Sequence, residues 1–212
     1  MLQHGRQAAL RDEDHEQAQA KAKVHGQGEE RVPPRGKRTR YSKADRKSLS
    51  YSNDDGCLLP FFQDHPNCVN LIEIIDDSEC DKIYLITEYI SRGNLKEKVD
   101  KEGLDEAQTR RYFRDLVAGL EYCHEIAGVV HRDVKPENIM IDEGLRGKLV
   151  DFGVCHIMKD MNDEMTATAG STLFFAPEMC TGETFHGRRI DVWAAGVTLY
   201  YMVFKKYPFF TT

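Results

Sequence analysis

The chain has 212 residues, of which 41% are apolar and 30% charged, enough for one domain with a hydrophobic core and some unstructured chain. The longest mostly apolar run, residues 196–204, is about half as long as the roughly 20 residues of a membrane-spanning helix. Because the segment after Met1 is polar, we expect no secretory leader and a cytoplasmic location, with the nucleus as the alternative.

Charge is distributed unevenly along the chain. Residues 1–50 carry 12 Lys and Arg against 7 Asp and Glu, whereas the remainder carries 17 against 28. We expect residues 1–55 to form a basic, largely disordered leader, because their few large apolar side chains do not offset the entropy of ordering. The Pro-, Lys- and Arg-rich run 31–47 is typical of a solvated linker. Its alternative is a binding segment for nucleic acid, an acidic protein surface or a nuclear import receptor.

From residue 56 onwards the pattern indicates a folded domain of the α+β class. Residues 69–76 and 83–90 are β-branched and apolar, which predicts an antiparallel hairpin. Asp105 and Gln108 have the spacing of a capping box at the start of a helix. The apolar stripe of that helix is predicted to consist of Phe113, Leu116, Val117, Leu120 and Cys123.

The rest of the domain is predicted to contain short strands and one long helix. Three apolar runs, 128–131, 139–141 and 148–150, are each bounded by polar turns, as short strands are. Residues 190–204 are apolar nearly all the way round a helix, which predicts a buried helix.

Four motifs follow one another in this region. His131-Arg-Asp-Val-Lys-Pro-Glu-Asn138 lies between two of the short strands, and Asp151-Phe-Gly153 follows the third. Ala176-Pro-Glu178 and Asp191-Val-Trp193 come next, the latter opening the long helix. In this order and on these elements, the motifs resemble those of the protein kinases. The resemblance implies a two-lobed fold. Residues 56–90 would form part of the small lobe and the hinge, and residues 91–212 a mainly helical large lobe.

The resemblance implies phosphoryl transfer from ATP with Mg²⁺, which needs positioning and charge neutralisation more than covalent chemistry. Asp133 would accept the proton of the substrate hydroxyl, and Lys135 would reach the transferred phosphate. A Lys two residues after this Asp is typical of the Ser/Thr-specific kinases, so the resemblance favours a Ser or Thr acceptor. Asn138 and Asp151 would supply the oxygen ligands that suit Mg²⁺. The alternative for these four residues is a set of unrelated, solvated turn side chains.

The resemblance also implies an ATP-binding set. Thr87 would line the back of the adenine pocket, and the backbone of Glu88 and Ile90 would pair with the adenine edge. Met140 would lie beneath the base, and Glu137 would also contact the nucleotide. For Thr87 and Met140, simple core packing is the alternative.

Between the second and third motifs lies the segment that corresponds to a kinase activation segment. Arg132 would pair with a phosphate on this segment, at Thr166 or preferably at Thr168, unless both stay unmodified. Ser171 would touch the catalytic Asp and the substrate. Structural roles are implied for His131, Phe152, Gly153, Glu178 and Asp191.

Within the kinases, the chain is most similar to the calcium/calmodulin-dependent protein kinase kinase group. The similarity rests on His65-Pro-Asn67, on residues 71–77 and on residues 187–200. It implies a protein substrate, such as a downstream kinase, and neither a membrane nor a nucleic-acid partner. Calmodulin is not supported, because that group binds it after the kinase domain.

The chain also departs from the family pattern. No Gly-x-Gly-x-x-Gly loop precedes the domain, and Ala22-Lys-Val24 is the only weak candidate for the phosphate-anchoring strand Lys. Only Asp54 and Asp55 stand near the position of its usual helix Glu. We therefore expect a kinase domain that is incomplete at both ends, lacking the last helices of the large lobe. The second hypothesis is a catalytically dead, kinase-like module that acts by binding partners, and a third is nucleic-acid binding through residues 31–47.

Overall fold

The computed structural model describes residues 37–42, 65–76 and 82–209, and all structural statements below concern these residues. The strands are β1 Lys37–Ser42, β2 Leu71–Asp76, β3 Lys82–Thr87, β4 Val129–Val130, β5 Ile139–Ile141, β6 Gly147–Leu149, β7 His156–Ile157, β8 Glu164–Met165 and β9 Phe185–His186. The α-helices are α2 Leu95–Lys101, α3 Glu106–Glu121 and α4 Gly187–Phe204. A π-helical turn, Tyr122–Ile126, continues α3, and 3-10 turns occur at Pro136–Asn138, Thr172–Phe174 and Pro177–Cys180.

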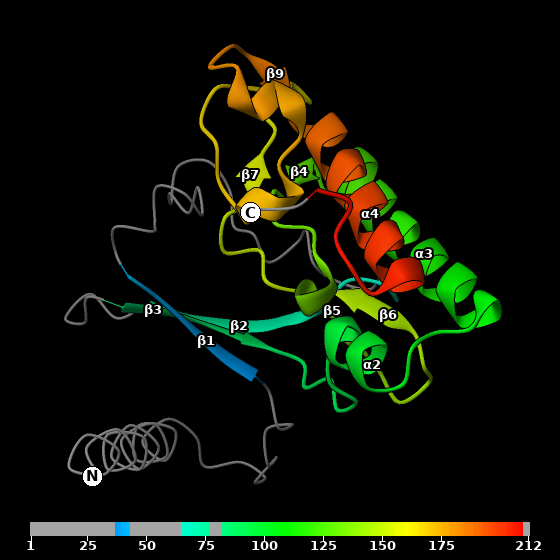
Figure 1. Ribbon diagram of the computed structural model, residues 1–212. Helices are drawn as coiled ribbons and strands as arrows, with labels where there is room; N and C mark the ends of the chain where they lie inside the picture. Colours follow the sequence, from blue (N-terminus) through cyan, green and yellow to red (C-terminus); the bar gives the residue numbers. More distant parts are fainter. Residues whose placement is uncertain (1–36, 43–64, 77–81, 210–212) are drawn as a thin grey trace, which may run out of the picture. The chain divides into compact units, whose positions relative to one another are not determined.

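Three strands form an antiparallel sheet with β3 in the middle, in the order β1-β3-β2 (Figure 1). The β2–β3 pairing confirms the predicted hairpin. At the end of β3, Thr87 is the register partner of Leu71 in β2 and of Lys37 in β1. The chain therefore leaves this sheet at the position where the hinge was predicted.

Strand β1 lies inside segment 1–55, which we expected to be a leader, and inside the expected basic linker 31–47. Three of its six residues are basic, a composition that natural proteins use on edge strands. Pairing of its backbone with β3 makes it part of the sheet. Composition alone does not reveal this, because the hydrogen bonds come from a strand some forty residues away. The rest of segment 1–55 lies outside the described residues.

The start of α3 confirms the predicted capping box. The carboxylate of Asp105 accepts a hydrogen bond from the backbone N–H of Gln108 at 2.7 Å. In return, the Gln108 side-chain oxygen accepts one from the backbone N–H of Asp105 at 3.1 Å. Two N–H groups that the first turn would leave unpaired are thus satisfied, which fixes where α3 begins.

The buried face of α3 differs in part from the predicted stripe. Leu116, Leu120 and Cys123 are buried as predicted, but Val117 is 45% exposed and Tyr112, which we had not included, is 2% exposed. One residue rotates a helix by about 100°, so Val117 turns away from the face that Leu116 and Leu120 define. Tyr112, four residues before Leu116, lies on that face.

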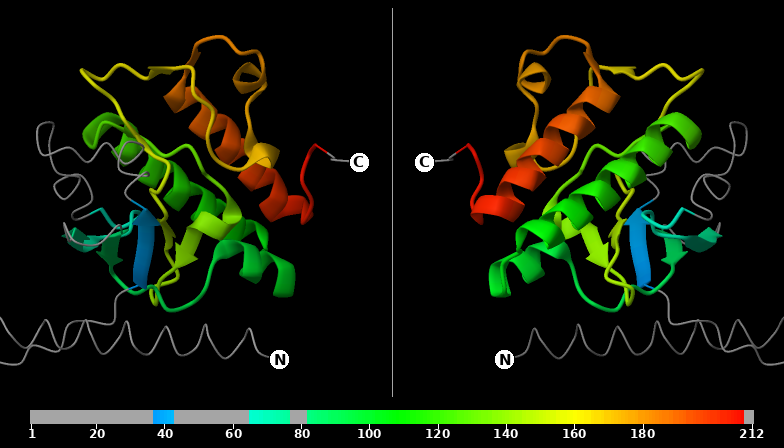
Figure 2. Two further views of the ribbon diagram at one scale, coloured as in Figure 1. Left: turned by 90° about the vertical axis from the view of Figure 1, so that its left-hand side faces the viewer. Right: turned by 90° about the vertical axis from the view of Figure 1, so that its right-hand side faces the viewer.

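Helix α4 begins at Gly187, three residues earlier than predicted, and lies beside α3 in Figures 1 and 2. Half of its 18 residues are buried, but Val192 is 64% exposed and Phe204 is 56% exposed. The prediction of a completely buried helix is therefore wrong for one face of α4. Among the described residues, no helix is both long enough and apolar enough to cross a membrane.

The three predicted short strands are present, and they belong to two different ladders. β5 pairs with β6, whereas β4 pairs with β7. These ladders place the loop between β4 and β5 next to the segment that follows β6. The first and second kinase-like motifs lie on these two segments.

Candidate active site

The loop between β4 and β5 is held in place by Asp191 of α4, which is 1% exposed. Its carboxylate accepts hydrogen bonds from the backbone N–H groups of His131 and Arg132, both at 2.8 Å. It also lies 2.9 Å from Nε2 of His124. Arg132 has a φ of 70°, in the left-handed region, and such strain persists where surrounding contacts over-determine it. Asp191 of α4 thus fixes the backbone conformation of Arg132, the residue before Asp133.

His131 connects this loop to the strand that precedes Asp151. Its Nε2 lies 3.0 Å from the carbonyl oxygen of Val150, and its Nδ1 accepts the backbone N–H of Asp133 at 3.2 Å. Together these two contacts place the proton of a neutral ring on Nε2. Burial lowers the pKa of His131, which agrees with a neutral imidazole. Its ring also contacts the buried ring of Phe152 edge to face, with centroids 4.7 Å apart.

Asp133 is the centre of a hydrogen-bonded cluster. Its Oδ2 accepts from Nζ of Lys135 at 2.6 Å and from Nδ2 of Asn138 at 2.9 Å. Its Oδ1 accepts from both the backbone N–H and the hydroxyl of Ser171 at 2.9 Å. Burial raises the pKa of Asp133, but the bonds from Lys135 and Ser171 outweigh this and leave it below its usual value. Asp133 is therefore an ionised acceptor at neutral pH.

Ser171 reaches Asp133 because the chain before it passes unusually close to the loop between β4 and β5. Gly170 has a φ of 100°, and a Cβ built there would lie 2.2 Å from the carbonyl oxygen of Arg132. Only glycine allows this approach. Lys135 Nζ donates to the Ser171 hydroxyl as well, at 2.9 Å. The structure thus brings together the four predicted residues Asp133, Lys135, Asn138 and Ser171.

Asn138 and Asp151 carry side-chain oxygens of the kind that Mg²⁺ binds. Asn138 uses Nδ2 for its bonds to the carbonyl and carboxylate of Asp133, which turns its side-chain oxygen to a different direction. Asp151, exposed and at a φ of 63°, accepts the backbone N–H of Gly153 at 3.3 Å. No cluster of three or more His, Cys, Asp or Glu that could hold a metal occurs among the described residues. Mg²⁺ suits such a sparse set, because it keeps waters and binds substrate phosphates besides one or two protein oxygens.

The predicted nucleotide residues lie on two segments: Thr87, Glu88 and Ile90 at and after the end of β3, and Glu137 and Met140 in the 3-10 turn Pro136–Asn138 and in β5. The backbone N–H of Glu88 donates to the carbonyl of Asn70 at 2.9 Å, so this N–H already has a partner. Ile90 is 7% exposed, and Met140 is half-buried in β5. Oε2 of Glu137 is buried and has no hydrogen-bond partner within the described part of the chain. Their contacts with a nucleotide stay predictions.

The segment between Asp151 and Glu178 places its two candidate threonines at the surface. Thr166 and Thr168 are both exposed. Arg132 Nη2 donates to the carbonyl of Ala167, the residue between them, at 3.3 Å. Glu178, which we expected to be structural, is half-buried, and its backbone carbonyl accepts the hydroxyl of Thr181 at 2.9 Å. The Arg132 guanidinium thus contacts the backbone between the two candidate modification sites.

Sequence reasoning missed two groups of charged residues. Lys148, 6% exposed in β6, forms an ion pair with Glu88 at 2.7 Å. Asp163 accepts from the backbone N–H of Arg188 at 3.1 Å and lies 2.9 Å from Nδ1 of His186, which ties the activation-segment region to α4. A lone lysine within an apolar strand was the available signal for the first group. No local pattern indicates the second.

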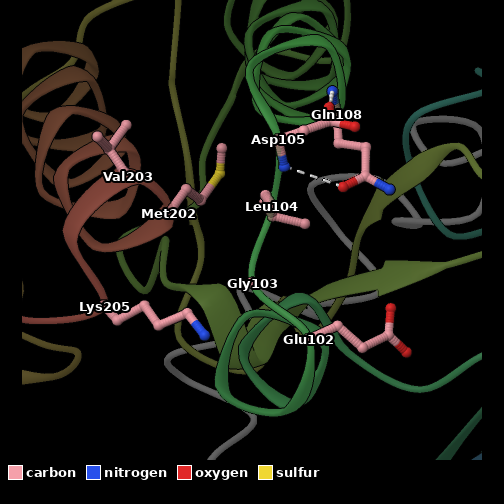
Figure 3. Close-up of a pocket in the computed structure, with 8 residues that line it drawn as sticks. All are labelled: Glu102, Gly103, Leu104, Asp105, Gln108, Met202, Val203 and Lys205. Carbon is pink, nitrogen blue, oxygen red and sulfur yellow. Dashed lines mark hydrogen bonds between the residues drawn. The ribbon is translucent and has the colours of Figure 1, made fainter.

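A pocket of about 560 Å³ lies between the α2–α3 connection and the end of α4 (Figure 3). Its lining residues are Glu102, Gly103, Leu104, Asp105, Gln108, Met202, Val203 and Lys205. None of the predicted catalytic or nucleotide-binding residues lines it. The candidate active site is therefore the cluster on the catalytic loop and not this pocket.

In this site a lysine, an asparagine and a serine hold one loop carboxylate, and a second loop carries another aspartate. This is the arrangement expected of a phosphotransfer site. The protein kinase domain family matches residues 37–212, so the chain belongs to the protein kinase family. Serine/threonine-protein kinase GRIK1 of Arabidopsis thaliana is 45% identical over 147 residues, which are 69% of this chain and 37% of that protein. GRIK2 of the same plant is 42% identical over 149 residues, again 69% of this chain and 36% of the relative.

A fungal relative also matches about two thirds of this chain. Serine/threonine-protein kinase ssp1 of Schizosaccharomyces pombe is 42% identical over 156 residues, 68% of this chain and 24% of that protein. The chain thus spans at most 37% of the length of these relatives. By family the chain is a protein kinase domain, and these three relatives are named serine/threonine-protein kinases.

Proposed function

We propose that this domain transfers the γ-phosphate of ATP, with Mg²⁺, to a serine or threonine hydroxyl of a protein substrate. The observation that carries the proposal is the Asp133 carboxylate, which Lys135, Asn138 and Ser171 hold in place and keep ionised. An ionised, oriented carboxylate is what a hydroxyl nucleophile needs as a proton acceptor.

Each residue of the site has a separate role in the proposed reaction. Asp133 accepts a hydrogen bond from the substrate hydroxyl at its carboxylate and takes the proton as the oxygen attacks. Lys135 Nζ, 2.6 Å from that carboxylate, places a positive charge where the transferring phosphate gathers negative charge. The side-chain oxygens of Asn138 and Asp151 would hold Mg²⁺. Bound Mg-ATP supplies the phosphoryl group and the metal that neutralises its oxygens.

We also propose that modification of the activation segment acts through Arg132. A phosphate on Thr168 would lie close to the guanidinium that now contacts the Ala167 carbonyl. Arg132 Nε is buried and has no hydrogen-bond partner among the described residues, so it retains a donor. A charge-assisted bond to phosphate would order this segment and with it Ser171.

The subgroup and cellular context belong to the same proposal. The similarity of residues 187–200 to the calcium/calmodulin-dependent protein kinase kinases supports a place among these enzymes and a downstream kinase as the substrate. We propose a cytoplasmic protein, or a nuclear one through its basic run 31–47, without nucleic-acid or membrane partners.

The experiment uses the purified chain, γ-labelled ATP and a mixture of unfolded protein substrates, with Mg²⁺ or with a chelator. We expect label on serine and threonine, none on tyrosine, and no transfer with the chelator. Label on tyrosine would overturn the acceptor assignment. No transfer under any condition, with no rise in melting temperature on adding Mg-ATP, would overturn the proposal and favour a binding module without activity.

A further inference from the structure

Residues 65–70 lie between the hinge and the strand that leads to Asp151. On one side they pair with β6, because Leu149 donates to the carbonyl of Asn67 at 2.8 Å and Val69 donates to the carbonyl of Leu149 at 2.9 Å. On the other side, the Asn70 carbonyl accepts the backbone N–H of Glu88 at 2.9 Å. This segment is thus a layer through which β6 and the hinge could be coupled.

The side chain of Lys148 extends from β6 across residues 65–70 to Glu88. Lys148 points from β6 to the side chain of Glu88, with Nζ 2.7 Å from Oε1, and lies 3.4 Å from the carbonyl of Cys68 on the way. The same Oε1 accepts the backbone N–H of Asn70 at 2.8 Å. The carboxylate of Glu88 is therefore held from two directions, by a side chain and by a backbone group.

The ion pair is largely removed from water. The Lys148 side chain is 7% exposed and that of Glu88 is 28% exposed. A buried ammonium is retained only when its charge is compensated, so the two side chains constrain each other's positions. Surface pairs such as Lys98 with Glu102, whose carboxylate is 67% exposed, impose far weaker restraints.

The pair joins the two ends of the predicted nucleotide site. Lys148 stands three residues before Asp151, and Glu88 stands two residues before Ile90. We propose that Lys148 is a positioning residue for nucleotide binding. By fixing the Glu88 side chain, it aims the backbone carbonyl of Glu88 and the backbone of Ile90 at the adenine edge. This inference rests on the proposed function, because it assumes that the hinge backbone binds adenine.

A purely structural ion pair and a positioning one predict different nucleotide selectivities. Adenine offers its 6-amino group to a carbonyl, whereas hypoxanthine presents an oxygen there and cannot donate to it. If Lys148 aims the Glu88 carbonyl, its loss weakens ADP binding much more than binding of inosine diphosphate. If the ion pair only adds stability, the melting temperature falls and the ratio of the two affinities stays unchanged.

The test compares Lys148→Met, which keeps most of the apolar stem, with Lys148→Arg, which can still pair with Glu88. Lys98→Met on α2 is the matched control, because it removes a lysine whose partner, Glu102, has a side chain that is 67% exposed. In Lys148→Met we expect ADP to bind about tenfold more weakly, while inosine diphosphate changes less than about twofold. Lys148→Arg should keep most of the selectivity, and Lys98→Met all of it. Equal changes for both nucleotides, or none, would overturn the inference.

Hydrogen exchange without nucleotide decides the case in which the wild type binds no ADP. The backbone amides of Asn70 and Glu88 should exchange faster in Lys148→Met than in the wild type or in Lys98→Met. Absence of ADP binding in the wild type would count against the proposed function alone. Unchanged exchange at these two amides would refute the restraint itself, whatever the nucleotide does.

Discussion

Replacement of Asp191 by alanine tests how the catalytic loop is held. In the folded protein, the Asp191 carboxylate accepts the backbone N–H groups of His131 and Arg132 and faces His124, all within 2.9 Å. Asp191→Ala removes the acceptor and leaves two N–H groups without a partner next to a carboxylate site that is 1% exposed. It also removes the support for the left-handed backbone of Arg132.

The expected cost follows from these contacts. A buried donor that loses its partner costs about 1–3 kcal/mol, and two donors lose theirs here. We therefore expect the free energy of unfolding to fall by about 4 kcal/mol. With a urea slope of about 2 kcal/mol per molar, the midpoint of urea unfolding should fall by about 2 M.

The measurement is equilibrium unfolding in urea, followed by circular dichroism. Glu183→Ala is the matched control, because Glu183 is an exposed acid and its loss should change the free energy by less than about 0.5 kcal/mol. If Asp191→Ala costs no more than Glu183→Ala, the carboxylate does not hold the loop and the anchoring argument is wrong.

Three further predictions concern the fold around the site. Asp105→Ala should lower the free energy of unfolding by about 1 kcal/mol and Asp105→Asn by less, measured in urea, since asparagine still caps a helix. Gly170→Ala should cost about 2 kcal/mol or more in the same assay, because its Cβ would meet the Arg132 carbonyl; a neutral result would contradict the close approach. Burial lowers the pKa of His131 from 6.5, so as pH falls below 6.5 the unfolded chain binds a proton that the folded chain excludes, and stability declines. In His131→Gln, whose amide both donates and accepts at every pH, this decline should be shallower by up to about 1.4 kcal/mol per pH unit; equal slopes would show that His131 does not titrate in this way.

Local signals in the sequence predicted the features that depend on neighbouring residues. Asp105 and Gln108 are three residues apart, and residues 69–76 are rich in the β-branched and apolar residues that favour strands, so both features were predicted. The exposure of Val117 was not, because an apolar residue at the edge of a helical stripe can face either the core or water. Strand β1 was missed for another reason: its order comes from backbone pairing with β3, which its basic composition does not show.

In the candidate site, too, the sequence predicted some residues and missed a contact between distant ones. Asp133, Lys135 and Asn138 lie within six residues of one motif, and the resemblance of that motif to the kinases implied their roles before their contacts were known. The distant partner Ser171 was expected only through the resemblance to kinases. The ion pair between Lys148 and Glu88 joins residues 60 positions apart, and no spacing rule connects them. Contacts of this kind are set by the packing of the whole domain.

The rate of phosphate transfer by Asp133→Asn tests the central claim most directly. Asparagine keeps the size of the side chain but cannot take the proton of a hydroxyl, so transfer to a serine or threonine substrate should fall by about 10³-fold. Glu183→Ala, measured beside it, should retain the rate of the wild type. If Asp133→Asn transfers phosphate as fast as the wild type, Asp133 is not the proton acceptor, and the catalytic role assigned to this loop is wrong.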